Sequence, residues 1–209
     1  MPRPQLSNLV DPKRTALVTQ ECQVGVVGTG ASLVALATEA QREALPNIIQ
    51  LLPVARAAGV QVIHCTIHRR SDGVGANSNA RLFASAKVSG NDLSPGSEGA
   101  SILPELGPEP EDLVLTRYHG VGPMGGTDLD AILRNLGVTT IVGVGVSVNI
   151  AIPNLVMDAV NAGYQVVLPR DAVAGVPREY AEQVIENSLS LLATVTFTQE
   201  LLAVWTSPG

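Results

Sequence analysis

The chain has 209 residues, 45% of them hydrophobic, which is enough apolar material to bury the core of one domain. Its formal net charge of −6 excludes the basic stripe that nucleic-acid binding requires. No apolar run has the length of a membrane span or of a signal peptide, so we expect a cytoplasmic protein without a membrane partner.

Short apolar runs rich in β-branched residues predict six strands, at 15–23, 60–68, 112–117, 139–146, 164–169 and 194–198. Apolar residues at helical spacing predict helices at 42–59, 127–137, 151–164, 178–193 and 199–205. In the first of these helices, Pro46 suits the first turn, Gly59 the end, and Pro53 should kink or break it. Thr127 is a possible N-cap of the second.

Strands that alternate with helices of this length predict a single α/β domain, spanning 1–209 with its core at about 11–205. We expect a doubly wound, mostly parallel six-stranded sheet with helices on both faces, a Rossmann-like three-layer arrangement. Residues at about 69–99 are rich in Gly, Ser and Asn, which predicts an excursion or lid outside the sheet.

Two kinds of site are disfavoured. The glycines of 120–126 lack both the Lys-Ser/Thr ending and the GxGxxG spacing of a phosphate cradle, and we interpret them as a loop over the site. Cys22 and Cys65 each lie in an apolar run, which predicts buried thiols rather than a disulfide framework.

Ligands of parallel α/β sheets bind at the carboxyl ends of the strands. The residues that the predicted strands place there are Glu21, His68, Arg117, His119 and the turn from Asn149 to Ala151. They form the candidate site.

Three segments resemble the isochorismatase-like hydrolase superfamily, which includes nicotinamidases and related cysteine hydrolases: TALVTQECQ, LVLTRYHG, and GTDLDAILRNLGVTTIVGVGVSVNIAIPNLVMDAVNAGYQVVLPRDAVAG. The resemblance covers about residues 11–205, and the long final block is its most specific part. It implies an isochorismatase-like fold, a small-molecule substrate, no cofactor, and a homo-oligomer, dimer or tetramer. It also implies a cis peptide near Val146–Ser147.

Members of the superfamily use an Asp after the first strand, a Lys after the third and a Cys at the turn after the fourth. The matching positions here hold Glu21, Arg117 and Ala151. A methyl group cannot attack a carbonyl, and the flanking Ile150 and Ile152 are apolar, so covalent amide hydrolysis at this turn is disfavoured.

Isochorismatases proper also carry a small residue at the cysteine position and cleave a vinyl ether by acid catalysis. By this likeness Glu21 would be the general acid and Arg117 a clamp for a substrate carboxylate. The chain departs from the family pattern in reading Glu-Cys-Gln for Asp-Met-Gln, and Arg cannot shuttle protons as Lys can. A plain ion pair between Glu21 and Arg117 is the structural alternative.

His119, His68, Asn149 and Ile150 are candidates for substrate binding. His119 follows Arg117 by two residues and would share its face if the strand continued, although it could equally be a loop residue without a role. Asp72 follows His68 without a second histidine nearby, so we expect no metal site.

Two functions follow from these residues. The first is a hydrolase without a cysteine nucleophile, acting by acid/base chemistry on a small carboxylate-bearing molecule, by vinyl-ether or related hydrolysis. The alternative is a catalytically retired pseudoenzyme that binds a small ligand or a protein partner.

A reassigned site built on His119 or Cys22 is less favoured, since strand alternation turns Cys22 away from Glu21. A closed, water-poor pocket that both Glu21 and Arg117 face would favour catalysis. An internally saturated Glu21–Arg117 pair with a collapsed cavity would favour retirement.

Overall fold

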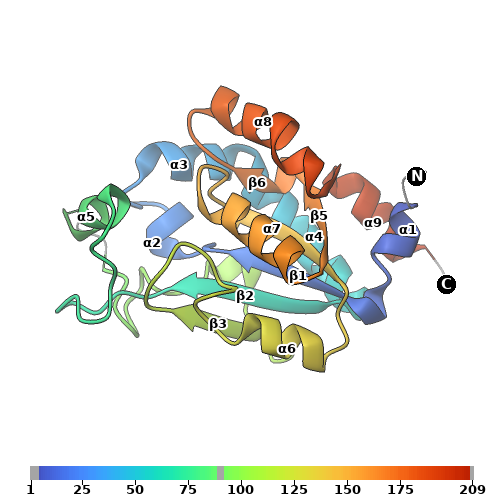
Figure 1. Cartoon of the computed structure of the whole chain (residues 1–209), viewed down its shortest axis with the longest axis horizontal. Helices are drawn as coiled ribbons and strands as arrows, with labels where there is room; N and C mark the ends of the chain where they lie inside the picture. The colour runs from blue at the N-terminus through green and yellow to red at the C-terminus, as the bar shows by residue number, and fades with distance from the viewer. Residues whose placement is uncertain (1–4, 89–91, 208–209) are drawn as a thin grey trace.

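A parallel sheet runs through the molecule in the order β3-β2-β1-β4-β5-β7 (Figure 1). The computed structural model describes residues 5–88 and 92–207. Residues 1–4 and 208–209 of the predicted domain, and 89–91 of the predicted excursion, lie outside the described residues. The strands are β1 Thr15–Gln20, β2 Gln61–Ile67, β3 Leu113–Arg117, β4 Thr140–Val146, β5 Gln165–Pro169, β6 Val173–Ala174 and β7 Thr194–Thr196. The predicted sheet is confirmed, with β6 as a seventh strand that pairs with β4 off the main path.

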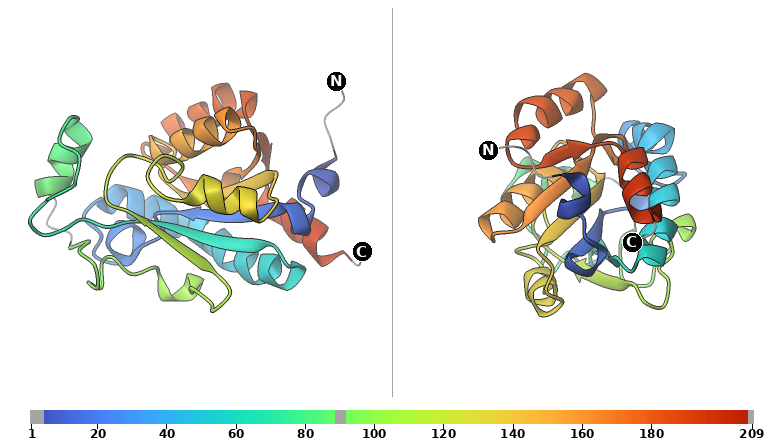
Figure 2. Two further views of the ribbon diagram at one scale, coloured as in Figure 1. Left: turned by 60° about the horizontal axis from the view of Figure 1, so that its bottom comes forward. Right: turned by 90° about the vertical axis from the view of Figure 1, so that its right-hand side faces the viewer.

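Helices cover both faces of the sheet, as predicted (Figure 2). They are α1 Leu6–Leu9, α2 Val24–Val27, α3 Val34–Glu39, α4 Leu45–Ala58, α5 Arg81–Val88, α6 Leu129–Asn135, α7 Ala151–Asn161, α8 Arg178–Asn187 and α9 Thr198–Thr206. A π-helical turn, Ala40–Ala44, joins α3 to α4. Short 3-10 segments lie at Pro12–Arg14, Pro104–Leu106, Arg170–Ala172 and Leu189–Leu191. No described helix is long and apolar enough to cross a membrane.

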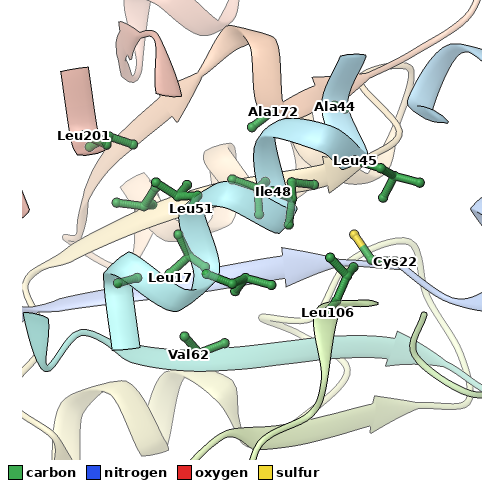
Figure 3. Packing of buried hydrophobic residues seen from close by; sticks show 14 of the residues in the cluster. Leu17, Cys22, Ala44, Leu45, Ile48, Leu51, Val62, Leu106, Ala172 and Leu201 are labelled. Carbon is green, nitrogen blue, oxygen red and sulfur yellow. The ribbon is translucent and has the colours of Figure 1, made fainter. Parts of the chain in front are cut away.

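Strand alternation divides the buried residues into two hydrophobic clusters. Leu17 of β1 belongs to the cluster that contains side chains of α4 and α9, including Ile48 and Leu201 (Figure 3). Its neighbour Val18 belongs to the opposite cluster, which contains side chains of α6, α7 and α8 such as Leu155. Burial of each large apolar side chain stabilises the fold by about 1.5–3 kcal/mol.

The helix α4 follows the sequence signals at its ends but not in its middle. Pro46 lies in its first turn, and Gly59 ends it with a φ of 85°. The prediction for Pro53 was a kink or a break. The break is wrong, because α4 continues through that residue. Pro53 and Ile49, four residues earlier, are both exposed, so water can bind the carbonyl group that Pro53 leaves unbonded.

The predicted excursion after β2 lies outside the sheet, and its described part contains α5. This helix lies at the end of the molecule away from both termini (Figures 1 and 2). The N–H of Arg69, the first residue of the excursion, donates to the Leu93 carbonyl at 2.8 Å and so brings Leu93 back to the end of β2. The Gly120 N–H, beyond the end of β3, donates to Asn77 Oδ1 at 2.8 Å. The excursion is therefore held over the carboxyl ends of β2 and β3.

Candidate active site

A cavity of about 260 Å³ lies at the carboxyl ends of the strands. Its lining includes six of the seven candidate residues, namely Glu21, His68, Arg117, His119, Ile150 and Ala151. The fold therefore brings together side chains that are up to 130 positions apart in sequence, as the strand-end rule predicts (151 − 21 = 130).

Glu21, directly after β1, has a left-handed backbone with a φ of 54°. No other non-glycine residue within 5–88 and 92–207 has a positive φ. Its N–H donates to the Cys65 carbonyl at 2.9 Å, which holds the turn in place. Such a conformation costs about 1–3 kcal/mol and is concentrated at functional sites, so its occurrence under the cavity points to a role for this carboxylate.

Glu21 and Arg117 form an ion pair at the base of the cavity. Glu21 Oε1 accepts hydrogen bonds from Arg117 Nη2 and, at 3.0 Å, from Gln20 Nε2. Arg117 is only 4% exposed, and its Nε and Nη1 have no hydrogen-bond partner among the described residues. The guanidinium group therefore has two buried nitrogens without an acceptor.

Ala151 begins α7 and lines the cavity with its buried side chain. The Ser147 carbonyl accepts from the N–H groups of Ile150, at 3.2 Å, and Ile152, at 3.0 Å. The Ala151 N–H between them donates to no described group. A free N–H at the start of an 11-residue helix favours negative charge at this point. The Val146–Ser147 peptide is cis, as expected.

Asn149 lies outside the cavity lining given by the described residues. Its Nδ2 donates to the Val176 carbonyl, and its Oδ1 accepts from the Val176 N–H at 2.9 Å. Both ends of the carboxamide are thus used to hold the turn before α7 against the segment that follows β6. This placement does not favour the predicted contact of Asn149 with substrate.

The two candidate histidines differ in environment. His68 lies one residue beyond β2, and its ring meets the Tyr118 ring edge-on at 5.9 Å between centroids. Burial lowers the pKa of His68, which keeps the imidazole neutral near pH 7. Its Nδ1 has no hydrogen-bond partner in the described part of the chain. His119 follows the end of β3 at Arg117 and is exposed at the cavity wall.

Neither thiol is placed for catalysis. Cys22 is in the cluster under α4, where Figure 3 shows it with Leu45 and Leu106, and Cys65 is in the cluster on the opposite face. Burial raises the pKa of each thiol to about 12, with a smaller contribution from the Glu21 charge at Cys22. Both predictions of buried cysteines are therefore confirmed. Among the described residues, no group of three His, Cys, Asp or Glu side chains is arranged to hold a metal ion.

The side chains of Thr19, His64 and Asp112 form a chain of hydroxyl, imidazole and carboxylate groups away from the cavity. Thr19 Oγ1 lies 2.8 Å from His64 Nδ1, and His64 Nε2 lies 3.2 Å from Asp112 Oδ2. Burial by itself would raise the pKa of Asp112, but hydrogen bonds from Arg56, the Glu109 N–H and His64 outweigh burial and lower it. All three groups are buried outside the cavity, so this network is structural despite its triad order.

Gln20 is a site residue that the sequence did not reveal. It is the last residue of β1, is fully buried, and bonds Glu21 through its Nε2. Its Oε1 has no partner among the described groups. The available signal was an amide side chain at the carboxyl end of a strand whose other residues are apolar or threonine.

The isochorismatase domain family matches residues 15–200. The ureidoacrylate amidohydrolase RutB of Agrobacterium fabrum is 29% identical over 203 residues, covering 88% of this chain and 88% of its own length. A cysteine hydrolase structure from Pseudomonas syringae pv. phaseolicola has a TM-score of 0.84 at 23% identity, over 98% of each chain, which shows the shared fold. An isochorismatase family protein from Desulfovibrio vulgaris has a TM-score of 0.76 at 27% identity, over 93% of this chain and 99% of its own. Because the family match extends over most of the chain and the folds agree, the protein belongs to the isochorismatase family of hydrolases.

Proposed function

We propose that this chain hydrolyses a small carboxylate-bearing molecule by acid/base chemistry, without a cysteine nucleophile. Glu21 is the acid/base, Arg117 binds the substrate carboxylate, and the start of α7 at Ala151 stabilises negative charge. Vinyl-ether hydrolysis is the reaction that needs least from the protein, because a single positioned acid and water suffice.

The observation that carries this proposal is the incomplete pairing of Arg117. A buried guanidinium group normally has all of its donors satisfied, because each unpartnered donor costs about 1–3 kcal/mol. Here the pair with Glu21 leaves Nε and Nη1 buried without partners, in a residue that lines the cavity. A planar carboxylate matches the fork geometry of such donors. The name of the relative RutB gives ureidoacrylate, itself a carboxylate, as that protein's substrate.

The chemistry can be written for a vinyl ether. The substrate carboxylate binds at Arg117, and the Glu21 carboxyl group enters the reaction in its protonated form as the general acid. Glu21 then delivers its proton to the terminal carbon of the enol ether, and an oxocarbenium ion forms. Water adds to this cation and returns a proton to Glu21, and the hemiketal breaks its C–O bond to give a ketone and an alcohol.

The alternative function is a retired enzyme that keeps the pocket for binding. The direct Glu21–Arg117 ion pair favours it, because two paired groups need no substrate. The presence of a cavity and the two unpartnered nitrogens of Arg117 weigh against a collapsed, self-saturated site.

A release assay separates the two functions. Purified protein is incubated with vinyl ethers, amides and ureas that carry a carboxylate, and pyruvate and ammonia are measured, with Glu21→Gln beside wild type. We expect turnover that iodoacetamide leaves unchanged, since both thiols are buried, and that Glu21→Gln abolishes. Ligand binding without turnover in any reaction class would favour the retired enzyme instead.

A further inference from the structure

The cavity is lined by two chemically different groups of residues. One group consists of Glu21, Arg117 and the N-terminus of α7. The rest of the wall includes large apolar side chains that the proposed reaction does not use, from the chain before and within α3 and from the excursion after β2: Leu33, Leu36, Leu82, Phe83 and Leu93.

Two of these leucines are unusually exposed for their type. Leu33 is 57% exposed and Leu82 of α5 is 43% exposed, although both line the cavity. Phe83, next to Leu82, is half-buried. Exposed apolar side chains gathered at the rim of a pocket mark a surface that a ligand covers.

The apolar wall is positioned by specific contacts. The Gly25 N–H donates to the Gly99 carbonyl at 2.9 Å, which binds the far end of the excursion to α2. A Cβ at Gly25 would lie 2.9 Å from that carbonyl oxygen and 3.0 Å from Leu93 Cδ2. Only glycine permits this approach, so the sequence is adapted to hold Leu93 against the cavity.

We propose that the substrate carries an apolar body of alkyl or aryl type on its carboxylate, and that Leu82, Phe83 and Leu93 are its specificity determinants. The carboxylate lies at Arg117 and the apolar body packs against the wall formed by α3 and the excursion. The identity of the anionic end rests on the proposed function. The preference for an apolar body rests on the wall alone.

Straight-chain carboxylates from acetate to hexanoate are the probes, titrated into the protein by NMR, which measures millimolar Kd values. Each added methylene should tighten binding about fourfold, the expected value for a buried CH₂ group, until the tail reaches solvent. Hexanamide, which has the tail without the charge, should bind at least tenfold more weakly than hexanoate.

Leu82→Ser should weaken hexanoate several-fold and leave acetate unchanged. Leu191→Ser is the matched control, because Leu191 is 81% exposed and lies outside the cavity lining of described residues. Phe83→Ser provides a second test should the first variant fail to fold.

The outcomes distinguish this inference from the proposed function. Equal Kd values from acetate to hexanoate, or loss of hexanoate binding equally in Leu82→Ser and Leu191→Ser, would overturn the apolar specificity and leave the carboxylate site standing. Equal binding of hexanoate and hexanamide would overturn the carboxylate clamp of the proposed function while the apolar wall survives. No binding of any probe would overturn both.

Discussion

Removing both members of the Glu21–Arg117 pair tests whether the pair serves function or stability. In the double variant Glu21→Gln/Arg117→Met, one charge-assisted hydrogen bond is lost, worth about 1.5–3 kcal/mol. Two buried nitrogens without partners, Nε and Nη1, also disappear, and each costs about 1–3 kcal/mol in the wild type. The two nitrogens together cost about 2–6 kcal/mol, which offsets the lost bond, so we expect the free energy of unfolding to fall by no more than about 1 kcal/mol.

The single variants should behave differently. Arg117→Met leaves the Glu21 carboxylate, only 16% exposed, without its cation, and Glu21→Gln leaves a buried guanidinium without its anion. Each should lose about 3 kcal/mol or more, which corresponds to a fall in Tm of about 6 °C or more for a chain of this length. Urea unfolding of the four proteins gives the complete cycle. A loss of about 3–5 kcal/mol in the double variant would instead show that the pair stabilises the fold.

Three further predictions concern the surrounding polar groups. Burial lowers the pKa of His64 below its ordinary 6.5, so the unfolded state binds more protons and stability falls as the pH drops below about 6.5. His64→Asn should therefore flatten the dependence of the unfolding free energy on pH, measured between about pH 7.5 and 5.5, by up to about 1.4 kcal/mol per pH unit. An unchanged slope would contradict this prediction. Asp112→Ala should lower stability by about 3 kcal/mol in urea, because it removes the counter-ion of Arg56 and the partner of His64 Nε2, while Asp72→Ala on the surface changes it little. Equal effects of the two substitutions would remove the case for the network. Gln20→Leu should reduce kcat ten- to a hundredfold with KM nearly unchanged, by freeing Glu21; a wild-type kcat would show that Glu21 needs no such support.

The sequence predicts the sheet and most of the site because both follow from local signals. Apolar runs fix the strands, and residues directly after parallel strands must meet at one edge, which is why Glu21, Arg117 and Ala151 could be named together. The two-residue β6 is too short to leave such a signal, and α4 continues through Pro53 because that residue is exposed.

Other features depend on contacts that sequence spacing does not encode. The carboxamide of Asn149 bonds to Val176, 27 residues later, and so is directed away from the cavity. Gln20 looks like an ordinary strand residue until its bond to Glu21 is seen. The excursion has the composition of a Gly/Ser-rich loop. The cavity wall nevertheless includes three of its apolar residues, Leu82, Phe83 and Leu93.

The most direct test of the central claim compares the turnover of three proteins on one hydrolysed substrate: wild type, Glu21→Gln, and the cysteine-free variant Cys22→Ala/Cys65→Ala. We expect the cysteine-free protein to keep its kcat within about threefold of wild type and Glu21→Gln to lose at least about a hundredfold in kcat. Full activity in Glu21→Gln together with loss of activity in the folded cysteine-free protein would contradict it and return the chemistry to a thiol.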